Sequence, residues 1–355
     1  MKRVLAAMMV VLLVLAWNLA PQWHAVLLAA WLAAWWFYTG IALGGLANIW
    51  LHNLTGGKWG EVIREPLLLA SRKLWLAPLL FLPVLLGMHE LYPWAGSAAT
   101  GMARWSGELA APAFKNAWLE PRFFILRSAG YLLLWWLLAW MMRNPARQRS
   151  RPFAALALIL YGVSVSLASV DWIMSLMPLW YSSVFGWLLG TGQMLAGMAL
   201  AALCAARARP ASPQLLADLG NLLMMYVLTW AYLAFTQFLI IWAADLPHEI
   251  AWYLPRSRPA WLVVSGLLAL FHFFVPMLVL LFRRAKRSAW VMARLAVLLL
   301  AMHLLDIWWL ILPSVAAGQP AWLWAAPLAL LAMSALLLPF FQGKASAAAR
   351  KPRHA

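Results

Sequence analysis

The chain alternates between long apolar stretches and short polar connections along its whole length. Several stretches reach the roughly 18 apolar residues that cross a bilayer as a helix. Because the runs are continuous, they predict helices and not the short alternating strands of an outer-membrane barrel. Gly, Pro and charged residues mark the boundaries between them. The pattern predicts ten transmembrane helices, over residues 4–20, 24–51, 69–89, 122–142, 153–175, 183–206, 214–243, 261–282, 289–312 and 321–341.

Composition agrees with an all-α, polytopic membrane fold. Of the 355 residues, 66% are hydrophobic and 10% are charged, whereas a soluble domain is about a quarter charged. The formal net charge of +17 would suit nucleic acid, but the cations lie in short loops between apolar runs, as membrane topology requires. Nucleic acid is therefore not an expected partner. The single cysteine, Cys204, excludes cysteine-ligated clusters, c-type haem attachment and an internal disulfide, and no metal site is predicted.

The distribution of Lys and Arg predicts the orientation. Twenty of them flank one set of helix ends and five flank the other, with Arg127 and Arg294 inside helices. The positive-inside rule therefore places both termini in the cytoplasm. Residues 1–342 are predicted to form the integral membrane domain, and residues 343–355 a disordered basic tail. The first helix has an alternative interpretation as a cleaved signal peptide, because a basic start precedes a short apolar core.

Ionisable groups inside the predicted helices are the best pointers to function, since a charge at the bilayer centre costs about 2.5–3.5 kcal/mol. Asp171 lies near the end of the fifth predicted helix. Tyr161, Ser164 and Ser175 share its face, at helical spacings of three and four. Asp171 fits a protonatable group at the outer mouth of a proton or quinol pathway. It equally fits an acid that caps the segment after the helix.

Three further groups lie within the eighth and ninth predicted helices. His303 and Asp306 are three residues apart on one face, so that they can share or pass a proton; a structural interhelical pair is the alternative. His272 lies near mid-membrane, and Pro276 has no amide to offer its carbonyl, so a kink is expected there. A core histidine with satisfied hydrogen bonds is the alternative for His272.

The second predicted helix carries a polar stripe of Tyr38, Asn48 and His52. This stripe fits the inner half of a proton path, or a row of interfacial polar groups. The proton-handling candidates are therefore Asp171, His272, His303, Asp306 and His52, with supporting polar residues Tyr161, Ser164, Ser175, Asn48 and Tyr38.

Two segments resemble those of a known family. VDWIMSLMPLWYSSVFG (170–186) resembles a signature of one membrane subunit of alternative complex III, a bacterial quinol:cytochrome c oxidoreductase. QFLIIWAADLPHEIAWYL (237–254) resembles a second segment of that polysulfide-reductase-like, F-type ten-helix subunit. Weaker matches follow the same order along the chain: LTGGKWG (54–60), LEPRFFILRSAGYLLLWW (119–136) and LLDIWWLILP (304–313).

The resemblance implies two four-helix bundles plus two peripheral helices in a bacterial inner membrane. It implies a subunit, not catalytic alone, that supports quinol oxidation and proton translocation, with quinol or quinone as its ligand. The implied partners are a sister ten-helix subunit and periplasmic haem c and iron–sulfur subunits, which carry the redox cofactors. The periplasmic subunits would dock on the longer outer loops, residues 90–121 and 244–260.

The chain departs from the family pattern at Met177 and Leu179, where the family has Glu and His. Two titratable groups beside Asp171 are therefore absent. Three other functions remain open from the sequence. They are a secondary transporter, a b-type cytochrome with haem held by His272 and a second histidine, and a non-catalytic scaffold subunit.

Overall fold

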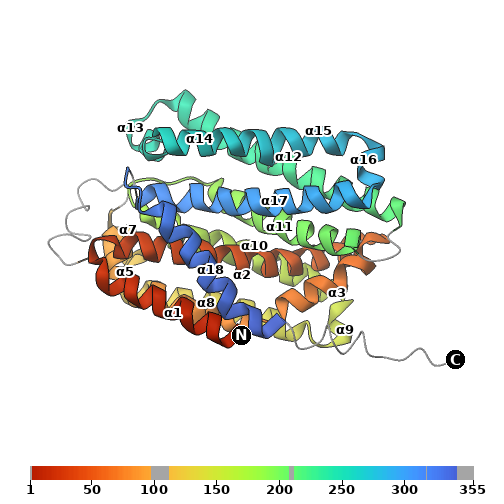
Figure 1. Ribbon diagram of the computed structural model, residues 1–355, viewed down its shortest axis with the longest axis horizontal. Coiled ribbons are helices and arrows are strands. Elements are labelled where there is room, and N and C mark those ends of the chain that lie inside the picture. The colour runs from red at the N-terminus through yellow and green to blue at the C-terminus, as the bar shows by residue number, and fades with distance from the viewer. Residues whose placement is uncertain (1, 97–111, 208–211, 317, 342–355) are drawn as a thin grey trace.

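The computed structural model describes residues 2–96, 112–207, 212–316 and 318–341, and these ranges contain helices and no strands. The predicted tail, 343–355, and part of the first outer loop lie outside the described residues. The longer helices, labelled in Figure 1, are α1 (Lys2–Leu19), α2 (His24–Thr55), α3 (Trp59–Ser71), α4 (Ala77–Leu86), α8 (Pro121–Met141), α10 (Arg151–Trp172), α11 (Phe185–Arg207), α12 (Pro213–Ala244), α14 (Pro259–Leu267), α15 (Val275–Leu281), α17 (Ala289–Ile311) and α18 (Trp322–Phe341).

Short elements connect these helices. The short α-helices are α5 (Met88–Leu91), α7 (Pro112–Trp118), α9 (Pro145–Gln148), α13 (Pro247–Ile250) and α16 (Arg283–Arg287). The 3₁₀ turns are η1 (Pro21–Trp23), η2 (Leu74–Leu76), η3 (Pro93–Ala95), η4 (Met174–Leu176), η5 (Pro255–Ser257) and η7 (Leu312–Ser314). A π-helical segment, η6 (Leu268–Phe274), joins α14 to α15.

Eight segments of the described chain are long and apolar enough to cross a membrane. They are Pro21–Thr55, Trp59–Leu86, Pro121–Met141, Arg151–Leu176, Phe185–Arg207, Pro213–Ala244, Pro259–Leu281 and Ala289–Ser314. They correspond to the second to ninth predicted helices, which confirms a multi-pass, all-helical membrane protein. The first and tenth are helical as α1 and α18 but are not among the eight, and the apolar part of α18 is the shorter Trp322–Leu337. A count of ten spans therefore stays a prediction.

The third predicted helix, 69–89, begins too late. The structure starts this segment at Trp59 and interrupts it at η2, before α4. Its first turns carry charge, including Arg64, and the sequence pattern is therefore that of a loop. In the fold Arg64 is buried and donates to Asn53 Oδ1 at 2.9 Å and to the Gln148 carbonyl at 2.5 Å. These bonds hold the charged half of the segment against the bundle.

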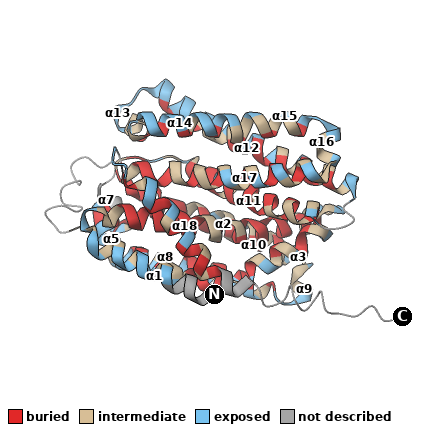
Figure 2. Ribbon diagram, in the orientation of Figure 1, coloured by how far each residue is buried: buried red, intermediate tan, exposed pale blue. Residues whose placement is uncertain are grey.

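The centre of the bundle is α2, which is buried over most of its length and packs on α11, α18, α10, α3 and α17. Figure 2 shows buried residues concentrated along α2, α11 and α17, and exposed residues along α12, α14 and α15 at one edge. Exposed apolar side chains on those edge helices suit contact with lipid. The division into two four-helix bundles plus two peripheral helices stays a prediction.

Small residues allow α2 and α11 to approach closely. Gly40 and Gly44 form a G-x-x-x-G pair on α2, a spacing typical of tight helix contacts in membranes. A Cβ atom on Gly44 would lie 1.9 Å from the Gln193 carbonyl oxygen, and one on Gly197 would lie 2.5 Å from the backbone nitrogen of Gly45. Only glycine fits at these two crossing points, so the backbones of α2 and α11 are in direct contact.

The connections separate into two ends of the bundle, as Figure 1 shows. One end holds the start of α3, α9 and α16, and the other holds α5, α7 and α13. The first end carries the Arg-rich and Lys-rich loops, and is called the basic end below. This separation is the one that the sequence predicts. The assignment of the basic end to the cytoplasm stays a prediction.

Candidate functional site

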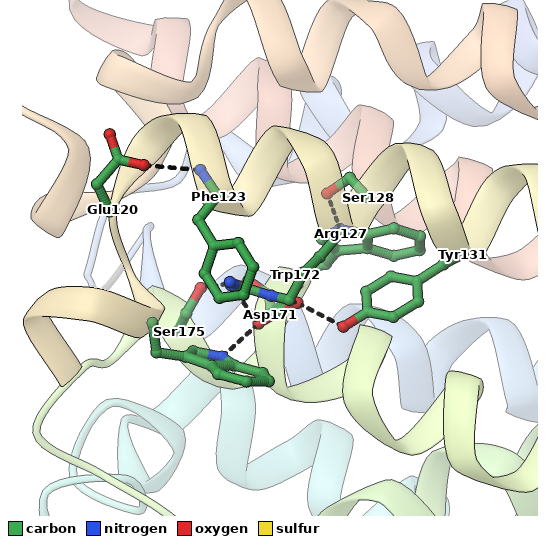
Figure 3. A network of polar contacts seen from close by, with 9 residues as sticks. Glu120, Phe123, Arg127, Ser128, Tyr131, Asp171, Trp172 and Ser175 are labelled. Carbon is green, nitrogen blue, oxygen red and sulfur yellow. Dashed lines mark hydrogen bonds and ion pairs between the residues drawn. The ribbon is translucent and has the colours of Figure 1, made fainter. Parts of the chain in front are cut away.

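Asp171 lies at the centre of a polar network formed by α7, α8 and α10 (Figure 3). Its carboxylate accepts from Arg127 Nε at 2.9 Å and from the same guanidinium's Nη2 at 3.0 Å. Trp118 Nε1 donates at 2.7 Å and the Tyr131 hydroxyl at 2.9 Å. The side chain of Asp171 is completely buried. We call Trp118, Arg127, Tyr131 and Asp171 the Asp171 network.

Local sequence explains why Arg127 is in position. Glu120 caps α8 by accepting from the Phe123 amide at 2.7 Å, which is favourable because the first amides of a helix have no partner within it. Arg127 lies one turn later, over the Phe123 ring at 4.3 Å and the Trp118 ring at 4.1 Å. The guanidinium is therefore held between two aromatic rings and both oxygens of Asp171.

The neighbours of Asp171 tie its helix end to the core. The Ser175 hydroxyl donates to the Asp171 carbonyl, and Trp172 Nε1 donates to Ser128 Oγ at 2.9 Å. The Tyr92 hydroxyl donates to the Trp172 carbonyl at 3.0 Å. Burial, and secondarily the Asp171 carboxylate, raise the pKa of Tyr92 well above its usual value, so Tyr92 remains a neutral donor. Asp171 thus belongs to a charge-balanced network in which both of its carboxylate oxygens accept two hydrogen bonds, whereas Arg127 Nη1 has no partner among the described residues.

A second buried cluster lies among α12, η6 and α17. The Trp230 indole stacks on the His272 ring at 4.2 Å between centroids and donates from Nε1 to Asp306 Oδ2 at 3.1 Å. His303 lies one turn before Asp306 on α17. All four residues are buried. We call Trp230, His272, His303 and Asp306 the histidine cluster.

The imidazoles of the histidine cluster differ from Asp171 in their hydrogen bonding. No ring nitrogen of His272 or His303 meets hydrogen-bond geometry with another described residue, although His272 lies near the backbone of Met302. His303 packs against α11 at Gly192, where a Cβ would lie 2.8 Å from its Cε1, and against the Phe37 ring at 6.0 Å. Buried polar atoms usually have partners. Two such imidazoles beside a carboxylate are therefore candidate proton carriers.

The helix is irregular at His272, as Pro276 predicts. The Val275 amide bonds to the Leu270 carbonyl, five residues back, and Pro276 follows at the start of α15. Such widened turns are frequent at functional sites. Here the widened turn carries His272 within the histidine cluster.

His52 fastens the connection between α2 and α3. Its Nε2 pairs with the Gly57 carbonyl at 2.8 Å, and its Nδ1 with Arg64 Nη2 at 3.3 Å. Because Arg64 can only donate, Nδ1 accepts and Nε2 carries the proton. A Cβ on Gly60 would lie 2.0 Å from the His52 ring. Both ring nitrogens are occupied, and the contacts are those of a structural histidine.

The stripe on α10 meets two different neighbours. The Tyr161 hydroxyl donates to Gln193 Oε1 on α11 at 3.1 Å. Ser164 accepts from Trp135 Nε1 on α8 at 2.9 Å, and Ser175 bonds to the backbone of its own segment. Tyr161 and Ser164 lie on α10 with Asp171, whereas Ser175 lies in η4, beyond the end of the helix at Trp172. The bonds of these residues do not join into one path to the Asp171 carboxylate.

The stripe on α2 is divided in the same way. The Tyr38 hydroxyl bonds to Ser334 Oγ on α18 at 2.5 Å. Asn48 donates to the Met194 carbonyl on α11 at 2.8 Å and accepts from the Tyr226 hydroxyl on α12 at 2.7 Å. Asn48 therefore joins three helices at the centre of the bundle. Its role in packing is evident from these contacts, and a role in proton transfer stays a prediction.

Sequence reasoning missed the partners of both acids. Arg127 was counted only as an intramembrane cation, although an intramembrane charge needs a partner and Asp171 was available. Trp230 carried no signal at all among the 26 tryptophans of the chain. A buried Arg256 was also missed.

Arg256 lies at the end of the bundle opposite the basic end. It donates to the carbonyls of Trp252 at 2.7 Å, Trp309 at 3.2 Å and Leu310 at 2.7 Å, and to Ser314 Oγ at 3.0 Å. Its guanidinium also lies over the Trp252 ring, 3.2 Å from the centroid. Burial lowers the pKa of Arg256 well below its usual value. The cation satisfies carbonyls at the end of α17, where the helix dipole favours positive charge.

Two apolar cavities lie on the α2–α4 side of the bundle. One of about 240 Å³ is lined by residues of α2, α4 and α18, including Tyr38. The other, of about 510 Å³, adds residues of α1. Neither is lined by a member of the Asp171 network or the histidine cluster. Within the described residues, no group of three or more His, Cys, Asp or Glu side chains is arranged to hold a metal ion.

Fold and composition together define a multi-pass helical membrane protein with buried polar clusters between its spans. No protein-family model matches the chain, and no curated protein sequence matches it.

Proposed function

We propose that the chain is an integral membrane subunit of a bacterial quinol:electron-acceptor oxidoreductase of the alternative complex III kind. The observation that carries this proposal is the histidine cluster. Oxidation of a quinol releases two electrons and two protons, and protons released at membrane depth need a buried acceptor. His272, His303 and Asp306 supply titratable groups between spans, where such groups are rare and mark proton relays.

The two segments that resemble the family support the same proposal, because they pack together. Trp180 of the first stacks on Trp252 of the second at 4.1 Å, and Ser182 donates to Gln237 at 3.1 Å. The contact lies at the end opposite α16, the end that the proposal assigns to the periplasm. There, haem c and iron–sulfur subunits would dock and a sister membrane subunit would lie alongside. The redox centres belong to those partners in this proposal.

Affinity purification of the tagged chain from its native membrane tests the proposal. The expected product is a complex with a haem c absorbance spectrum, an iron–sulfur signal in electron paramagnetic resonance, and quinol-dependent reduction of a soluble acceptor. A chain that purifies alone, with no redox partner and no bound quinol, would contradict it.

A secondary transporter is the second candidate, favoured by the widened turn at His272, because transporters bind solutes at interrupted helices. Solute uptake by the reconstituted single chain would support it.

A scaffold without proton chemistry is the third candidate, and the neutralisation of Asp171 by Arg127 favours it. Activity of the complex after substitution in the histidine cluster separates the scaffold from the leading proposal.

A further inference from the structure

The short helix α16 concentrates cations at the junction of two spans. Its five residues include Arg283, Arg284, Lys286 and Arg287, and a single residue separates it from α15 on one side and from α17 on the other. It lies at the basic end of the bundle (Figure 1). Within the described chain none of these four cations forms an ion pair.

Packing divides the four cations into one anchor and three exposed groups. Lys286 Nζ donates to Asn221 Oδ1 on α12 at 2.6 Å, and its stem lies against Gly220, where a Cβ would be 2.8 Å from Lys286 Cγ. Arg283, Arg284 and Arg287 are exposed. Arg287 is four residues from Arg283 and three residues from Arg284, so it neighbours both of them on the helix surface. The anchor therefore holds α16 against α12 and leaves the three guanidinium groups exposed.

Large apolar side chains flank these arginines. Phe282, which is 66% exposed, directly precedes α16, and Trp290, which is 62% exposed, lies in the first turn of α17. Arg294 lies over the Trp290 ring at 3.4 Å from its centroid. Aromatic side chains beside cations at the end of a span are typical of the headgroup region of a bilayer.

The apolar surface continues along both spans. On α15 the exposed positions Leu278 and Leu281 are three residues apart, and the exposed Phe282 follows the helix directly. On α17 Val297 lies one turn beyond the exposed Arg294. A molecule with a phosphate at the arginines would therefore meet apolar helix surface where its chains extend into the membrane. A soluble acidic protein would leave that apolar surface uncovered.

We propose that α16 and its flanking aromatic residues form a binding site for an anionic phospholipid. The phosphate would lie against Arg283, Arg284 and Arg287, because guanidinium groups bind phosphate by paired hydrogen bonds. The acyl chains would lie along α15 and α17. This site is separate from the histidine cluster and does not depend on the proposed redox function.

Native mass spectrometry of the full chain in detergent tests the site, with dioleoylphosphatidylglycerol and dioleoylphosphatidylcholine as competing lipids. The variant Arg283→Gln, Arg284→Gln, Arg287→Gln removes the three exposed cations and keeps Lys286. The control Lys58→Gln, Arg72→Gln, Arg143→Gln removes the same charge from exposed positions elsewhere. At about one kcal/mol per cation near an anionic headgroup, the α16 variant should bind phosphatidylglycerol about a hundredfold more weakly. The control should bind as the wild type does.

Several outcomes would overturn the proposal. They are equal binding of the two lipids by the wild type, unchanged binding by the α16 variant, or an equal loss in the control. Displacement of the lipid by inorganic phosphate would indicate a free-anion site, and displacement by polyglutamate would indicate an acidic protein surface. Thermal unfolding of each variant in phosphatidylcholine alone, expected to match the wild type, separates lost binding from lost folding.

Discussion

Replacing Asp171 with asparagine keeps the shape of the side chain but removes the charge that balances Arg127. The carboxylate accepts four hydrogen bonds, two of them from the guanidinium. An asparagine presents one oxygen and one NH₂ group, and the NH₂ group would face the donors of Arg127, Trp118 or Tyr131. The variant therefore loses at least one pair of bonds and leaves a cation uncompensated in the protein interior.

Breaking a buried ion pair on one side costs about 3–5 kcal/mol, because the remaining charge stays desolvated. Asp171→Asn should lower the free energy of unfolding by that amount, measured by equilibrium denaturation of the purified chain in mixed micelles. Arg127→Met in the same chain removes the orphaned cation. The double variant should recover most of the loss, and the difference between the single and double changes gives the coupling energy.

The refuting result is a single Asp171→Asn variant within about 0.5 kcal/mol of the wild type, the range of ordinary surface substitutions. That outcome would mean that the ion pair does not hold α8 to α10. Asp171 would then again be a candidate proton carrier.

Two further substitutions test the packing. Gly44→Ala places a methyl group against the Gln193 carbonyl and forces α2 from α11, so the loss of unfolding free energy should be about 3 kcal/mol. Gly162→Ala meets no atom within 4 Å and, as the matched control, should stabilise by about 0.5–1 kcal/mol in the same denaturation assay; equal effects would exclude a glycine-dependent contact. Arg256→Met deprives the carbonyls at the end of α17 of their donors and should cost about 3 kcal/mol. Arg256→Lys should not restore the stability, because one ammonium cannot reproduce the planar fork that reaches Trp252 and α17 together; full rescue by lysine would show that charge alone matters.

Most of the helices could be predicted from the sequence because the features that indicate a helix are local. Apolar length, breakers between the runs and the sidedness of Lys and Arg are each read within one segment. The late start predicted for α3 shows the limit of this approach. Arg64 makes the first turns of that helix polar. Its hydrogen bonds to Asn53 of α2 and Gln148 of α9 explain why these turns pack as a helix against the bundle.

The candidate sites depended on contacts between segments, which the sequence pattern does not contain. The shared face of His303 and Asp306 was predictable from their spacing, as was the irregular turn at His272. The Trp230 indole that joins His272 to Asp306 comes from α12, and no pattern within one helix indicates it. The pairing of Asp171 with Arg127 likewise requires α8 and α10 to be neighbours.

The histidine cluster as a proton-handling site is the claim on which the proposed function depends most. The direct test is the rate of quinol oxidation by the affinity-purified complex, with the wild-type chain, Asp306→Asn and Asp306→Glu compared at equal haem content. A group that accepts a proton in the reaction contributes about 10²–10⁴-fold, so Asp306→Asn should lower the rate at least a hundredfold, and Asp306→Glu should retain much of it. A fully assembled Asp306→Asn complex that oxidises quinol at the wild-type rate would contradict the account.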